Sequence, residues 1–233
     1  CERPRIAVIH DSNIHSFMSG AFFHSDDQEL FFKAVEDGYG IDREDCDPDQ
    51  LDMFEYPMSR AIAARSRATI VHNRWARQHL DGIDSVYVIP HGAASNLRTC
   101  DPGLIARLRK RLSLGSHEFV AVTMGYVNRL KRVPIIVQAI AQLRALGYPV
   151  RLVIGGSITD EQEWLLHQIT ELELHDAVTV TGYLTDDEFD GLIQLSNVVL
   201  NLRYPSMGES SGTMYKAMAR EKPCIVSNYG QFA

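Results

Sequence analysis

A polar, glycine-bearing stretch near the end of the sequence carries residue types that bind phosphate. Residues 205–212 read PSMGESSG and follow an apolar run at 197–202 that has the length and β-branched content of a buried strand. A helix is expected to begin near Ser211, where its free N–H groups and the positive end of its dipole would attract an anion. At Gly212 or Thr213 that anion would meet several donors at once, and glycine places no Cβ between it and the backbone.

A carboxylate, Glu209, lies within the same stretch. It would repel a bare phosphate, but it suits a ligand in which a sugar is attached to the phosphate, because a carboxylate accepts hydrogen bonds from sugar hydroxyls. The alternative interpretation is that Ser210 and Ser211 only cap a helix and that Glu209 is solvated.

A basic turn earlier in the chain is the second candidate for anion binding. The strand expected at 119–124 is followed by G-Y-V-N-R-L-K-R, which contains Arg129, Lys131 and Arg132, and then by a helix over about 133–146. Open α/β sheets bind ligands at the carboxyl ends of their strands. The turn and the helix at Gly212 are therefore expected to meet one anion.

The elements around these residues predict a doubly wound, Rossmann-like domain. Five strands alternate with helices. The second strand ends in Gly155-Gly156-Ser157, which lacks the full spacing of a dinucleotide fingerprint. The five strands are expected at 119–124, 150–154, 177–181, 197–202 and 224–226, with helices at about 159–173, 186–195 and 211–222 between the later ones.

The residues before about 95 predict a separate α/β series, so we place a domain boundary between residues 95 and 96. Its first strand ends in His10, at the edge where ligands bind, which makes His10 a candidate for substrate contact; His15 is interpreted as structural. An HD phosphohydrolase site at His10-Asp11 is disfavoured, because partner histidines at metal-ligand spacing are not identified. Strands are expected at 5–10, 68–72 and 86–89, and helices at 26–36, at 50–66 and after an Asn73 cap.

Composition excludes several classes of protein. The 233 residues are 45% hydrophobic and carry a net charge of −7, which argues against disorder and against general nucleic-acid binding. The sequence has no apolar run of membrane-spanning length and no signal peptide, and its four cysteines lack metal-ligand spacing. We therefore expect a cytoplasmic protein with reduced thiols and without zinc. The basic helix at 103–112 is interpreted as a solvated face, with contact to an anionic membrane surface as the alternative.

Several motifs together resemble the retaining GT-B glycosyltransferases of the family 4 type. They are G-Y-V-N-R-L-K, V-I-G-G, V-T-V-T-G-Y, P-S-M-G-E-S-S-G-T and A-M-A-R-E-K-P-C-I-V-S, preceded by I-V-H-N-R-W and V-I-P-H-G-A. The resemblance implies an α/β protein with two Rossmann-like parallel-sheet domains, both incomplete. Residues 1–95 would be the later part of an acceptor domain, and residues 96–233 a donor domain that lacks its last helices. The chain is thus expected to be a piece of a longer enzyme.

The resemblance also implies roles for single residues. Lys131, six residues after Gly125, matches the lysine that neutralises the donor diphosphate, and Arg129 supplies a second charge because Tyr126 replaces the family's arginine. Glu209 matches the first of two glutamates and would contact the transferred sugar, whereas Lys216 stands near the position of the second. The catalytic set is Glu209, Lys131 and His10. The donor-binding set is Gly125, Arg129, Lys131, Tyr183, Leu184, Glu209, Ser210, Ser211, Gly212 and Thr213.

The implied reaction moves a sugar from a nucleotide-diphosphate sugar to an acceptor hydroxyl with retention of configuration and without a metal or cofactor. The acceptor would be a glycan, a lipid or another small molecule, with peripheral contact to the inner face of a membrane as an option. No carboxylate pair at hydrolase spacing is identified, so water is not expected as the acceptor. The alternatives are a sugar-nucleotide epimerase of similar fold and a module that binds a sugar nucleotide without turnover.

Overall fold

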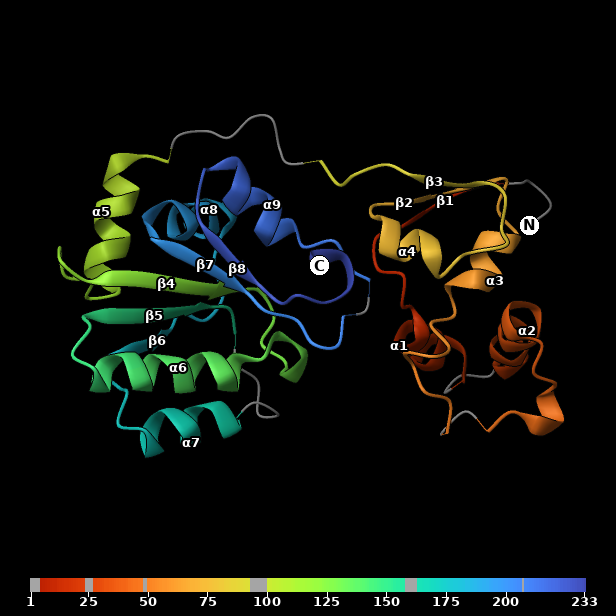
Figure 1. Cartoon of the computed structure of the whole chain (residues 1–233), viewed down its shortest axis with the longest axis horizontal. Coiled ribbons are helices and arrows are strands. Elements are labelled where there is room, and N and C mark those ends of the chain that lie inside the picture. Colours follow the sequence, from red (N-terminus) through yellow and green to blue (C-terminus); the bar gives the residue numbers. More distant parts are fainter. Residues whose placement is uncertain (1–4, 24–26, 48–49, 93–99, 158–162, 207) are drawn as a thin grey trace. The chain divides into compact units, whose positions relative to one another are not determined.

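The computed structural model describes residues 5–23, 27–47, 50–92, 100–157, 163–206 and 208–233 (Figure 1). The chain divides into two compact units. The first comprises Cys1–His91 together with Ser206–Ser210 and Ala233, and the second comprises Gly92–Pro205 and Ser211–Phe232. Each unit is built on a parallel sheet, as the α/β pattern of the sequence predicts.

The sheet of the first unit has three strands, β1 (Ile6–Ile9), β2 (Ala68–Val71) and β3 (Val86–Val88), in that spatial order. Its buried side chains form a small core with α4 (Arg74–Gln78). The side chain of Asn73 accepts a hydrogen bond from the Ala76 amide, which confirms the predicted cap. The remaining helices are α1 (His15–Met18), α2 (Gln28–Tyr39) and α3 (Ser59–Ala64), with a π-helical turn η1 (Ser19–Phe23) and a 3-10 turn η2 (Arg43–Asp45).

The helix predicted over 50–66 is wrong in its first half, since only α3 (Ser59–Ala64) is helical. Asp52 instead organises a turn: its side chain accepts from the Phe54 amide at 2.7 Å, and its carbonyl accepts from the Tyr56 amide at 2.8 Å. Pro57 then disfavours a helical conformation at Tyr56. The local hydrogen bonds of an aspartate therefore replace the helix that the apolar spacing suggested.

The second unit contains a five-stranded parallel sheet in the order β6-β5-β4-β7-β8. The order places the first strand in the middle and sends later strands to both sides, as in a doubly wound sheet. Each predicted strand is present, with ends that move by two residues at most. The strands are β4 (Phe119–Met124), β5 (Val150–Gly155), β6 (Val178–Val180), β7 (Val198–Asn201) and β8 (Cys224–Val226).

Helices cover both faces of this sheet (Figure 1). One layer is α6 (Val133–Ala145) and α7 (Glu163–Glu171), whose apolar side chains share a core with β5. The other is α5 (Pro102–Arg111), α8 (Asp186–Leu195) and α9 (Gly212–Ala219). On α9, Ala217 is buried against this layer, whereas Met218 is 57% exposed.

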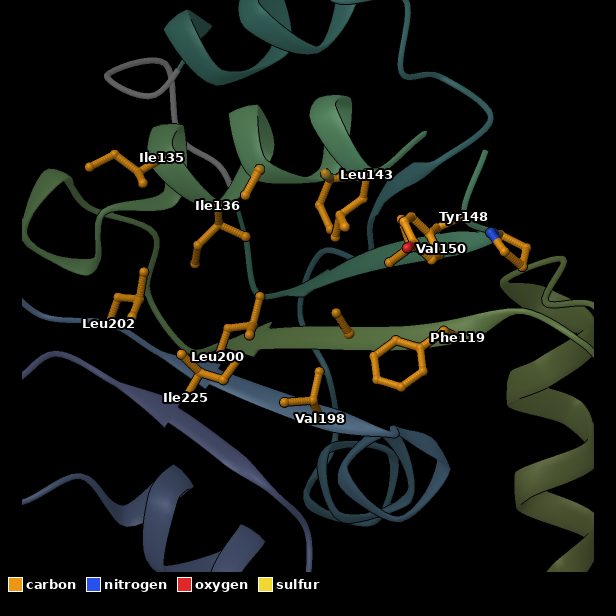
Figure 2. A pocket seen from close by; sticks show the side chains of 14 residues that line it. Phe119, Ile135, Ile136, Leu143, Tyr148, Val150, Val198, Leu200, Leu202 and Ile225 are labelled. Carbon is orange, nitrogen blue, oxygen red and sulfur yellow. The ribbon is translucent and has the colours of Figure 1, made fainter. Parts of the chain in front are cut away.

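An apolar cavity of about 420 Å³ lies between α6 and the sheet. Side chains from α6 and from β4, β5, β7 and β8 face it, and none of the fourteen lining residues is charged (Figure 2). A phosphate needs positive charge or N–H donors, so this cavity does not suit the predicted ligand.

Two further features concern the cysteines and membranes. Cys46, Cys100 and Cys224 are free thiols, and Cys1 lies outside the described residues. Burial raises the pKa of the Cys46 and Cys224 thiols, which keeps them protonated. Within the described ranges, no helix has the length and apolar character needed to cross a bilayer.

Candidate functional site

Glycines bring the turns after β4 and β5 into close contact. Gly125 has a φ of +90° and donates its amide to the Gly155 carbonyl at 2.8 Å. A Cβ on Gly156 would lie only 2.4 Å from the Gly125 carbonyl oxygen. Glycine is therefore required at position 156 for these turns to approach each other.

Lys131 lies over the turn that follows β4. It ends a short 3-10 helix, η3 (Arg129–Lys131), where its amide donates to the Asn128 side chain at 3.0 Å. Its ammonium donates to the Met124 carbonyl at 2.8 Å, and a Cβ on Gly125 would approach the Nζ atom to 2.7 Å. The absence of a side chain at Gly125 thus lets the ammonium occupy the carboxyl end of β4.

The N-terminus of α9 presents backbone donors, as predicted. Ser211 is the N-cap: its hydroxyl accepts from the Met214 amide at 3.3 Å and donates to the Asn201 side-chain oxygen at 2.9 Å. Space is open around Gly212, where an added Cβ meets nothing within 4 Å. Among the residues described, no acceptor contacts the amides of Gly212 and Thr213. Ser211 therefore supports the helix, and these two amides remain for an anion.

The Lys131 turn and α9 leave the same edge of the sheet. Their parent strands, β4 and β7, are parallel neighbours. The loops beyond them are joined directly, because the Tyr204 amide donates to the Leu130 carbonyl at 2.9 Å and the Arg132 guanidinium lies 5.1 Å from the centre of the Tyr204 ring. The structure thus brings the lysine turn and the donor-bearing helix to one edge of one sheet.

The other predicted donor-binding residues of this unit differ in exposure. Tyr183, after β6, is 83% exposed, so its ring is available to stack on a base. Leu184 is only 9% exposed and its side chain packs in the core beside Gly155. Arg129 is exposed at the start of the 3-10 turn. A role for Leu184 would have to come from its backbone.

Lys216 is held by an ion pair on the helical layer. Its ammonium lies 2.9 Å from Asp190 Oδ1 on α8, and the other oxygen of that carboxylate pairs with Arg220 at 2.9 Å. Lysine is thus fixed by its own partner at the position where the resemblance leads one to expect a ribose-binding glutamate. No carboxylate replaces that glutamate on α9, whose first turn contains no acidic residue.

The segment Ser206–Ser210, which belongs to the first unit, carries Glu209. Glu209 is only 8% exposed and accepts a hydrogen bond from the Ser206 hydroxyl at 3.2 Å, so the solvated alternative for this carboxylate is wrong. The Asn73 side chain donates to the Gly208 carbonyl and to the Ser210 hydroxyl, both at 3.2 Å. A Cβ on Gly208 would collide with the Trp75 ring, so glycine is needed there as well.

Two candidate histidines of the first unit differ in exposure. His15 is buried, with its Nδ1 atom 2.8 Å from the Tyr56 carbonyl oxygen, and is structural. His10 is exposed at the carboxyl end of β1, where His72 and His91 lie beside it.

In the part of the chain that the structure describes, no group of three or more His, Cys, Asp or Glu side chains has an arrangement that could hold a metal ion.

The basic side chains of α5 are largely engaged with the protein itself. Arg107 pairs with Asp101 at 3.6 Å, Arg109 donates to the Gly115 carbonyl at 3.1 Å, and Arg111 pairs with Glu188. These internal contacts favour the interpretation of the helix as a solvated structural face over a membrane-binding surface.

Sequence reasoning missed the residues that position the candidate side chains. These include two asparagines, Asn128 and Asn201, together with Gly156. An asparagine directly after an apolar run is a usable signal, because its side chain can cap a helix or fix a turn. The Cβ clash at Gly156 depends on Gly125, which is 31 positions away, so the sequence pattern could not reveal it.

A model of the family described as "Glycosyl transferases group 1" matches residues 105–233, which is more than half of the chain. The chain belongs to the group 1 glycosyltransferases. The match covers both the Lys131 turn and the N-terminus of α9. It therefore includes the edge of the sheet where the candidate donors lie.

One curated protein resembles this chain in sequence, and solved structures resemble it in fold. D-inositol 3-phosphate glycosyltransferase of Stackebrandtia nassauensis is 30% identical over 156 residues, which cover 63% of this chain and 34% of that protein. Anabaena HepE, solved with UDP-glucose, has a TM-score of 0.69 at 18% identity and is matched over 99% of this chain and 55% of its own. Sucrose-phosphate synthase of Thermosynechococcus elongatus has a TM-score of 0.64 at 22% identity. The match covers 97% of this chain and 50% of that protein. This glycosyltransferase chain thus spans a third to about half of these relatives.

Substitution of Gly156 by alanine tests the close approach of the β4 and β5 turns. We expect Gly156→Ala to lower the free energy of unfolding by about 1–3 kcal/mol, because its Cβ would overlap backbone that must then shift. Gly212→Ala is the matched control, with an expected change within about 0.5 kcal/mol because its Cβ enters open space. Urea denaturation of both variants measures the difference, and equal stabilities would contradict the clash.

The role of Lys216 can be tested through its partner. Lys216→Ala should cost less than about 1 kcal/mol of stability, because the pair is part-exposed and Asp190 keeps Arg220. Asp190→Ala should cost more, about 1–3 kcal/mol, because it leaves the well-buried Arg220 guanidinium without that acceptor. Thermal unfolding ranks the two variants, and a larger loss for Lys216→Ala would show that the lysine has another structural role.

Proposed function

We propose that this chain forms the donor-binding part of a glycosyltransferase that moves a sugar from a nucleotide-diphosphate sugar to an acceptor hydroxyl, with retention of configuration and without a metal. The observation that carries the proposal is the shared position of the Lys131 ammonium and the α9 N-terminus, at the carboxyl edge of adjacent strands. Family membership supports the class of reaction. The donor, the acceptor and the stereochemistry are part of the proposal.

The arrangement suits a diphosphate leaving group. Negative charge develops on the phosphate as the glycosidic bond breaks, and donors fixed in advance stabilise such charge most effectively. Lys131 supplies a full positive charge, and the amides of Gly212 and Thr213 supply donors at the positive end of a helix dipole. Because the Met124 carbonyl and the Asn128 cap hold the lysine in place, little reorganisation is needed when the donor binds.

The remaining roles follow from the chemistry of each side chain. Glu209 is assigned to hydroxyls of the transferred sugar, and the exposed Tyr183 to stacking on the base. The proton of the acceptor hydroxyl would pass to the leaving phosphate. A uridine diphosphate sugar is the first donor to test, because the similar Anabaena protein was solved with UDP-glucose.

One observation favours a second candidate, a module that binds a sugar nucleotide without turnover. The Asp190 ion pair keeps Lys216 at the position where a carboxylate would be expected to hold the ribose. Incubation of the complete protein with labelled UDP-glucose and a panel of acceptors separates the candidates. Release of UDP only when an acceptor is present supports a transferase, and interconversion of the free donor means an epimerase. Binding without either reaction means a module, and no binding of any nucleotide sugar would refute the proposal.

The proposal predicts a large effect at Lys131. In the complete enzyme, Lys131→Ala should leave the fold intact and lower kcat by roughly 10²–10³, the cost of removing one fixed donor from developing negative charge. Lys110→Ala is the matched control, because Lys110 is an exposed lysine on α5, away from the sheet edge. Turnover of Lys131→Ala equal to that of Lys110→Ala would remove this lysine from the mechanism.

A further inference from the structure

Three histidines follow the three strands of the first unit. His10 comes directly after β1, His72 directly after β2, and His91 shortly after β3, so all three lie at the carboxyl edge of one sheet. The ring centres of His10 and His72 are 4.7 Å apart, and those of His72 and His91 are 5.3 Å apart. His10 is already a candidate for substrate contact. The contacts of His72 decide which chemical form of His10 is present.

The hydrogen bonds of this group run in one direction. His72 Nδ1 lies 2.8 Å from the Ile89 carbonyl oxygen, which can only accept, so Nδ1 carries the proton of a neutral His72. Its Nε2 atom is then an acceptor, and it lies 2.9 Å from His10 Nδ1. His10 must therefore donate from Nδ1, which leaves the Nε2 atom of a neutral His10 with a lone pair.

The backbone fixes the start of this chain of hydrogen bonds. The Ile89 amide donates to the Val71 carbonyl at 2.9 Å, which continues the β2–β3 ladder beyond Val88. The Ile89 carbonyl is thus set by the sheet itself. His72 directly follows Val71 on the neighbouring strand, so the same ladder also fixes the backbone from which the His72 side chain extends.

We propose that His72 is a positioning residue that holds His10 in the tautomer protonated at Nδ1, so that His10 Nε2 accepts a hydrogen bond from a substrate hydroxyl. The identity of that ligand, a sugar hydroxyl, rests on the proposed function. The tautomer does not, because it follows from the contacts with His72 and Ile89 alone.

The tautomer can be observed without any assay of turnover. Two-bond ¹H–¹⁵N correlation spectra of the 233-residue chain at pH 8, above the usual histidine pKa of about 6.5, report which ring nitrogen carries the proton. We expect His10 to be protonated at Nδ1 in the unmodified chain and at Nε2 in His72→Phe, which keeps an aromatic ring but removes the acceptor. His79→Phe is the matched control, because His79 contacts Trp75 on α4 and should leave the His10 tautomer unchanged. Protonation of His10 at Nε2 in the unmodified chain would overturn the proposal.

The effect on catalysis is tested in the complete enzyme. His72→Phe should lower kcat at least roughly tenfold, because His10 protonated at Nε2 cannot accept a hydrogen bond from the substrate at that atom. The KM for the donor should change little. His72→Gln retains an oxygen acceptor for His10 Nδ1 and should recover part of the loss. Unchanged kcat in His72→Phe, with the tautomer shift observed, would overturn the positioning role but leave the proposed transferase intact. If no variant, the unmodified enzyme included, turns over a nucleotide sugar, the proposed function fails and the spectra still decide the tautomer.

Discussion

The pairing of β4 with β7 is the constraint on which the candidate donor site depends. Two parallel neighbours must release their following loops at one edge, so a lysine after one strand and a helix after the other are brought together by the sheet. The hydrogen bond from the Tyr204 amide to the Leu130 carbonyl then joins the loops directly.

Three glycines at this edge leave space that a side chain would fill. Gly125 leaves space for the Lys131 ammonium, Gly156 lets its own turn meet the Gly125 carbonyl, and Gly212 leaves the start of α9 open. The first two glycines set the position of a charge, whereas the third leaves room for the group that the charge attracts. A substitution at 156 should therefore act on folding, and one at 212 on binding.

Much of this could be predicted from the sequence, because the second unit follows local rules. Its strands are apolar runs bounded by turn residues, and its helix ends carry standard caps such as Ser211. The features that the sequence did not predict have one local and one tertiary cause. The helix predicted from residue 50 was overridden by hydrogen bonds to Asp52, and the burial of Leu184 depends on packing against Gly155 from another strand. The contact of His72 with His10, 62 positions away, likewise could not be predicted from the sequence pattern.

The two candidate chemistries in the chain use opposite means of fixing a side chain. The Lys131 ammonium donates to the Met124 carbonyl and its backbone amide to the Asn128 side chain, and an ammonium attracts an anion from many directions. The proposed tautomer of His10 offers a single lone pair at Nε2, and a neutral imidazole distinguishes a donor from an acceptor at one atom only. A charged side chain attracts its ligand strongly but with little dependence on direction. A neutral acceptor with one fixed lone pair forms a weaker hydrogen bond that depends strongly on direction. A diphosphate requires the former and a sugar hydroxyl the latter, which is why a tautomer set by His72 would affect turnover more than donor affinity.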